Sequence, residues 1–129
     1  MLNDLTIKDF FKNKIPVGTI LANLGKGTSK IEVYSSDGIK YKRGNSTITL
    51  KFNSIYDVWS NFENQDVSSI DLRKFAPRVF DSSKSGHSCN CTFLFMILKE
   101  SGVINEIKGN GVAGSPYYIH LPSFQEAAD

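Results

Sequence analysis

The segment DSSKSGHSCNCTFLFM, from Asp81 to Met96, carries both cysteines of the chain and one of its two histidines. His87, Cys89 and Cys91 alternate, and alternate side chains of an extended segment share one face. Zinc prefers three or four nitrogen and sulfur ligands, so these residues together with His120 are a candidate metal site. Ligands separated by a single residue fit poorly around one tetrahedral ion. The spacing therefore favours the polar start of a buried helix over a metal site.

A nucleophilic cysteine is a second interpretation of the same segment. A helix N-terminus lowers the pKa of a thiol, and His87 is close enough in the sequence to act as its base. The sequence identifies no third group that would orient this histidine, and a cysteine and a histidine alone are weak support for catalysis. We therefore expect no catalytic cysteine here.

Glu106 and Lys108, in the segment NEIK, have the E-x-K spacing of many metal-dependent nucleases, and Asp81 lies upstream. On one strand, Glu106 would reach a Mg²⁺ ion and Lys108 the attacked phosphate. A three-residue pattern arises easily by chance, and a long predicted helix separates Asp81 from Glu106. A nuclease remains the weaker alternative, and we assign no catalytic residue, no metal and no cofactor. We favour a protein that is not an enzyme.

Basic residues form three groups with the side chains that contact phosphates. The first lies in the acid-free segment GIKYKRGNSTITLKF, the second around a short helix and the loop SSKSGHS, and the third beside a glycine-rich loop. We predict as nucleic-acid-binding residues Lys40, Lys42, Arg43, Arg73, Lys74, Lys84, Ser85, His87, Lys108 and Asn110. The alternative is that these residues are solvated surface charges. The segment GKG, at 25–27, lacks the full phosphate-loop pattern and is predicted to be a plain turn.

The first half of the chain must position the first basic group. Residues 5–14 are predicted as a short helix capped by Asn3 or Asp4, and Pro16 prevents its continuation. From there to Phe52 the hydrophobic pattern alternates, with turns at 23–29, 35–38 and 44–46. Residues 1–52 are therefore predicted to form a helix followed by a small antiparallel meander.

The second half changes to helical spacing. A helix is predicted to begin at Asn53 or Ser54, and a second, shorter helix is predicted with Ser68 as its cap and Asp71 three residues on. A third helix, starting at Ser88 or Asn90, has an apolar run over 93–98 and ends near Gly102. Two strand-like runs then flank a glycine-rich loop that contains Gly109, Gly111 and Gly114. Residues 122–129 are predicted to be a frayed tail.

This order of elements over 53–121 resembles a winged helix-turn-helix domain, with VSSIDLRKF as the short second helix and ESGVINEIKGNGVAGSPYYIHL as helix end, strand, wing and strand. The resemblance implies a module that binds nucleic acid or another protein. The loop APRVFDSSKSGHSCN is longer than the family pattern, and the third helix carries few side chains that read base edges. Phosphate contacts are therefore favoured over sequence-specific ones. The whole sequence also resembles small proteins carried on bacterial mobile elements, although no motif carries this likeness.

The composition bounds these interpretations. The chain has 129 residues, of which 40% are hydrophobic and 22% charged, and is expected to form a single α+β domain of 1–129. This domain is predicted to consist of a helix and meander (1–52), a winged-helix-like half of three helices and a β-hairpin (53–121), and the tail (122–129). The net charge of +2 permits a nucleic-acid partner without requiring one. The alternative partner is a protein, including a second copy of the chain in a homodimer. The sequence has no long apolar run and no secretory signal, and its two cysteines are closely spaced. These features favour a cytoplasmic protein without a membrane partner.

Overall fold

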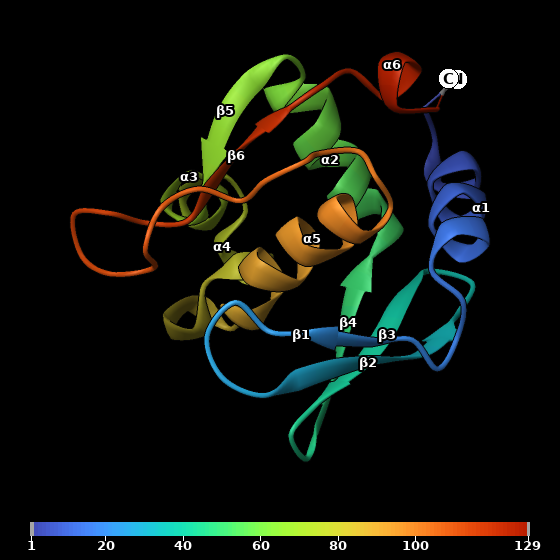
Figure 1. The fold of residues 1–129 in the computed structure, drawn as a ribbon, viewed down its shortest axis with the longest axis horizontal. Helices are drawn as coiled ribbons and strands as arrows, with labels where there is room; N and C mark the ends of the chain where they lie inside the picture. The colour runs from blue at the N-terminus through green and yellow to red at the C-terminus, as the bar shows by residue number, and fades with distance from the viewer. Residues whose placement is uncertain (1, 129) are drawn as a thin grey trace.

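The computed structural model describes residues 2–128 and shows an α+β fold (Figure 1). No helix in this part of the chain is long and apolar enough to cross a membrane. The strands are β1 (Ile20–Ala22), β2 (Thr28–Tyr34), β3 (Gly38–Arg43), β4 (Ser46–Lys51), β5 (Gln65–Ser68) and β6 (Tyr118–Leu121). The helices are α1 (Asp4–Lys14), α2 (Phe52–Phe62), α3 (Ser69–Phe75), α4 (Pro77–Phe80), α5 (Cys89–Glu100) and α6 (Phe124–Ala128), with a 3-10 turn, η1 (Ser82–Lys84), before α5.

The first half of the chain forms the predicted helix and meander. Asn3 caps α1 in a reciprocal capping box with Thr6, and β1 to β4 form one antiparallel sheet in chain order. The turn between β2 and β3 closes at Gly38, whose carbonyl oxygen accepts from the Ser35 amide at 2.9 Å. A Cβ atom on Gly38 would lie 2.8 Å from the carbonyl oxygen of Leu50 on β4. Only glycine therefore allows the two strands to approach this closely.

Helix α5 lies in the middle of the molecule, between the meander and the β5–β6 pair (Figure 1). The ring of Tyr41 on β3 stacks on Phe93 with centroids 3.6 Å apart, and the Tyr41 hydroxyl donates to Asn90 Oδ1 at 2.7 Å. Every side chain from Phe93 to Leu98 is buried, which confirms the prediction of a core helix. The hydrophobic core contains residues of both halves of the chain, because α5 is covered on both sides.

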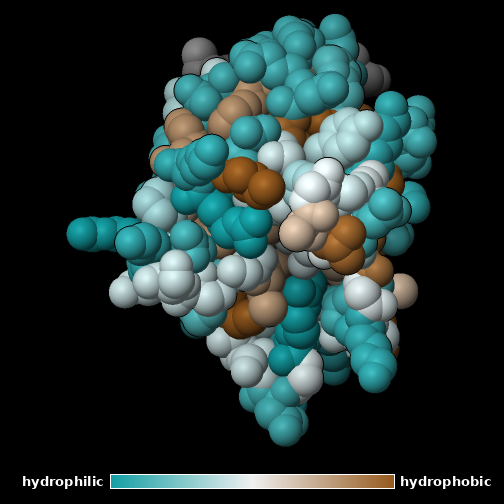
Figure 2. All heavy atoms as spheres, turned by 90° about the vertical axis from the view of Figure 1, so that its left-hand side faces the viewer, coloured by the Kyte–Doolittle hydropathy of each residue, from teal (hydrophilic) through white to brown (hydrophobic). Residues whose placement is uncertain are grey.

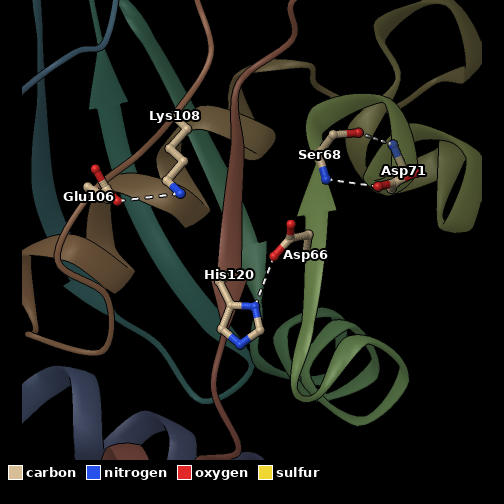
Figure 3. Close-up of polar contacts among 6 residues, drawn as sticks. All are labelled: Asp66, Ser68, Asp71, Glu106, Lys108 and His120. Atoms are coloured by element: carbon tan, nitrogen blue, oxygen red, sulfur yellow. Dashed lines mark hydrogen bonds and ion pairs between the residues drawn. The ribbon is translucent and has the colours of Figure 1, made fainter.

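The two helices before α5 follow the predicted spacing but differ at their ends. Helix α2 begins at Phe52 after Lys51, which makes no side-chain capping bond, whereas the sequence predicted a cap at Asn53 or Ser54. Ser54 is instead buried in the first turn. The cap of α3 is as predicted. Ser68 and Asp71 exchange two hydrogen bonds at 2.9 and 3.0 Å (Figure 3).

Strand β6 pairs mainly with β5 rather than with the segment before the glycine-rich loop. The predicted hairpin is reduced there to one antiparallel bridge, between Lys108 and Tyr118. The chain leaves the extended conformation at Gly109, where φ is +89° and a Cβ atom would lie 2.0 Å from the Pro116 carbonyl oxygen. The glycine therefore ends the pairing with β6 directly after Lys108.

The prediction of a frayed tail is wrong. Residues 124–128 form α6, and Phe124, only 9% exposed, packs edge-on against Trp59 and Phe10 with centroids 5.0 and 5.9 Å away. The Trp59 indole donates to the Pro122 carbonyl oxygen at 2.8 Å. The free energy gained by burying the Phe124 ring exceeds the conformational entropy lost when this segment is ordered.

Candidate nucleic-acid interface

A hollow of about 670 Å³ opens beside the loop between β1 and β2 and over the ends of β2 and β3. Its lining contains four cationic residues and no acidic one. The lining residues are Ile20, Asn23, Lys26, Gly27, Thr28, Lys30, Lys42, Arg43 and Gly44. We call this feature the basic hollow. Since phosphate oxygens carry negative charge, its lining suits a phosphate better than a neutral ligand.

Two lysines of the basic hollow lie directly opposite each other. Lys30 on β2 and Lys42 on β3 are register partners, and both side chains are exposed. Neither forms an ion pair with any residue of the described chain. Like charges at directly opposed positions destabilise a sheet by roughly 0.2–1 kcal/mol. An anion bound between the two lysines would offset this repulsion.

Arg43 is held by hydrogen bonds at the inner side of the basic hollow. Its Nε donates to Ser29 Oγ at 2.8 Å and its Nη1 donates to Thr92 Oγ1 on α5 at 3.0 Å. Ser29, which is fully buried, donates in turn to Asn23 Oδ1 at 2.6 Å. The guanidinium group therefore ties β3 to β2, to α5 and to the β1–β2 loop. It fixes the shape of the hollow besides contributing charge.

The β1–β2 loop brings Lys26 to the rim. The Asn23 side chain donates to the Lys26 carbonyl oxygen at 3.0 Å, and the Asn23 amide donates to Gly27 at 3.0 Å. Gly27 has a φ of +81°, which glycine adopts without strain. The GKG segment is thus the predicted turn. Lys26 and Lys30 were not among the predicted site residues, because strand register is not visible in local sequence.

Only two of the sequence-predicted binding residues line the basic hollow. Lys40 lies on β3 opposite Thr49, and Arg73 lines another hollow, of about 360 Å³, between α3, the start of α5 and the glycine-rich loop. Lys108 forms an exposed ion pair with Glu106 at 3.6 Å (Figure 3). The structure places the remaining predicted residues outside the lining of the basic hollow, namely Lys74, Lys84, Ser85, His87 and Asn110.

The histidine and cysteine segment lies at the start of α5, as predicted. Cys91 is 2% exposed, its Sγ is 3.6 Å from the Phe80 carbonyl oxygen, and burial raises its pKa to about 12. This side chain is therefore a neutral thiol at neutral pH. His120 pairs with Asp66 at 2.9 Å (Figure 3). Among residues 2–128 no group of three histidine, cysteine or acidic side chains is placed to hold a metal ion.

The residues of the nuclease alternative have other partners. Asp81 Oδ1 accepts from the Ser83 hydroxyl at 2.7 Å and from the Ser83 amide at 3.0 Å. These hydrogen bonds, with smaller contributions from Arg73 and Lys84, lower the pKa of the Asp81 carboxyl group. Asp81 thus caps η1. Glu106 lies outside every described strand, so it lacks the strand geometry on which the E-x-K hypothesis depended.

The face with α3 and the glycine-rich loop differs from the basic hollow. Figure 2 views the molecule from this side and shows apolar residues as small separate patches within polar surface. Such scattered patches are usual for protein surfaces and do not by themselves mark an interface. The basic hollow therefore remains the best-defined candidate site. The chain shows no significant match to any protein-family model, curated protein or solved structure with which it was compared.

Proposed function

We propose that the protein binds nucleic acid at the basic hollow, mainly through the phosphate backbone. The observation that carries this proposal is the direct opposition of Lys30 and Lys42 in an acid-free lining that also includes Lys26 and Arg43. Positive charges placed together on a strand pair reduce the stability of the folded chain, and bound phosphates offset that effect. Binding should weaken as salt rises, because it releases counterions from the nucleic acid.

The order α2, β5, α3, α5, β6, interrupted only by the short α4 and η1 before α5, supports a winged-helix-like arrangement of the second half. In such an arrangement α5 would be the recognition helix. Its residues from Phe93 to Leu98 are buried, and its exposed end carries Lys99 and Glu100. The helix therefore presents no side chain from 93 to 98 to a major groove. The proposal therefore places the nucleic-acid contact on the meander and predicts little sequence preference.

The test is fluorescence anisotropy with labelled double- and single-stranded DNA at two salt concentrations. The double variant Lys30→Glu, Lys42→Glu should bind far more weakly, and its salt dependence should correspond to about two fewer phosphate contacts. The matched control is Lys12→Glu, which reverses an exposed lysine on α1 outside the basic hollow. Absence of binding to either DNA at low salt, or equal losses in the control and the double variant, would refute the proposal.

A further inference from the structure

The edge strand β4 has a row of backbone groups that point away from the sheet. It pairs with β3 in continuous register, and the Phe52 amide donates to the Asp37 carbonyl oxygen at 2.9 Å at the end of this ladder. Hydrogen-bonded and non-bonded pairs alternate in an antiparallel ladder. The N–H and C=O groups of Thr47 and Thr49 and the N–H group of Lys51 therefore point outward. None of them bonds to a described residue outside the meander.

This edge lacks most of the usual protection against strand addition. Natural edge strands are short, bulged, interrupted by proline or charged, and of these devices β4 has only the exposed Lys51 at its end. Strand β1, at the opposite edge, has only three residues, and the β2–β3 ladder shifts register between Ile31 and Val33. Strand β4 has six residues, no proline, and no register shift against β3. It is thus the edge of the meander best suited to accept another strand.

A hollow of about 340 Å³ lies beside this edge. It touches Thr49 on β4, Val79 on α4 and the buried Asn90 on α5, so it lies between β4 and these two helices. Lys51 and Arg78 supply its cationic lining, and no acidic residue lines it. This hollow adjoins the edge at which a strand would be added. Since its charged lining is basic, an acidic side chain is the complementary one.

We propose that β4 binds an extended acidic segment of a partner protein as an added strand. Peptide backbone supplies both donors and acceptors at the spacing of β4, as in other complexes formed by strand addition. A phosphate backbone supplies acceptors only, and the outward carbonyl oxygens of Thr47 and Thr49 repel it. A second copy of this chain is disfavoured because Lys40 and Lys42, the cross-strand neighbours of those threonines, would bring like charges together.

The first experiment uses two labelled peptides of about seven residues, each roughly 23 Å long when extended. One alternates threonine with glutamate and the other alternates threonine with lysine. The glutamate peptide should bind and should slow the hydrogen exchange of the Thr49 and Lys51 amides, which NMR measures residue by residue. Failure of the glutamate peptide to bind up to about 1 mM overturns the proposal. So does equal binding of the lysine peptide.

The second experiment compares two substitutions at one position. Thr49→Pro removes an outward amide and leaves the β3 ladder intact, whereas Thr49→Val keeps the amide. We expect about tenfold weaker peptide binding for Thr49→Pro only. Arg78→Glu should weaken peptide binding by a similar factor, and Lys12→Glu is its control. If Thr49→Pro does not fold, the Arg78→Glu variant tests the proposal in its place. The proposal is overturned if all these variants bind the peptide with equal affinity. It is also overturned if the substitutions dissociate a dimer of this chain and leave peptide binding unchanged.

Discussion

Lys30 on β2 lies directly opposite Lys42 on β3, and no acidic residue lines the hollow that the two share. Lys42→Glu turns this like-charge pair into an opposite-charge pair. The free energy of unfolding should rise by roughly 0.2–1 kcal/mol, because the cross-strand repulsion is removed, while nucleic-acid affinity falls. Urea denaturation at low salt measures the first effect, and it should shrink at high salt. Lys40→Glu is the control, since Lys40 faces the uncharged Val33 and Thr49.

Arg43 should resist replacement by lysine. Its guanidinium group donates through Nε to Ser29 and through Nη1 to Thr92, and the single ammonium group of lysine cannot reproduce this fork. Arg43→Lys should lower the free energy of unfolding by about 1–3 kcal/mol, because Ser29 is buried and loses a partner. A double-mutant cycle that combines Thr92→Val with Arg43→Lys measures the coupling energy between these two side chains. A lysine variant as stable as the parent protein would contradict the structural role of Arg43.

Cys91 should be unreactive in the folded protein. Its side chain is buried and its pKa is raised to about 12, so little thiolate is present at pH 8. In a Cys89→Ser variant, which leaves Cys91 as the only thiol, alkylation should be at least about a hundredfold slower in buffer than in urea. Rapid alkylation of the folded variant would instead revive the interpretation of this segment as a nucleophile.

Stability should fall at alkaline pH. Burial raises the pKa of Cys91 from 9.0 to about 12, so the unfolded chain loses this proton before the folded chain does. The contribution to stability is fully present below about pH 9 and is lost as pH rises through 12. Burial also raises the pKa values of Tyr34 and Tyr41, which adds to the loss with the same sign. Urea unfolding from pH 7 to 10.5 checks this, and unchanged midpoints would contradict it.

Helix α6 should contribute to the stability of the core. Phe124→Ala removes an aromatic side chain that packs against Trp59 and Phe10, and should reduce the free energy of unfolding by about 3 kcal/mol. The fluorescence of Trp59, the single tryptophan, should shift to longer wavelength as water enters. Gln125→Ala, an exposed change in the same helix, should leave both quantities unchanged.

Local sequence determined the helices, turns and caps where the interacting residues are near neighbours. The Ser68–Asp71 capping box spans three residues, and the hairpin turn that closes at Gly38 begins at Ser35. The acid-free run around Lys42 also identified one side of the basic hollow. These features follow from sequence because contacts between residues close in the chain cost little loop-closure entropy and depend on few other residues.

Tertiary structure decided the contacts between distant residues. Lys30 meets Lys42 only because the β2–β3 turn and its register bring them together, and Thr92 reaches Arg43 only after α5 docks on the sheet. Phe124 likewise packs against Trp59, although most of the second half of the chain separates the two residues in sequence. A local pattern shows that a residue is polar or apolar. Which residue lies opposite it depends on the packing of the whole core, since register and docking are set by all buried contacts together.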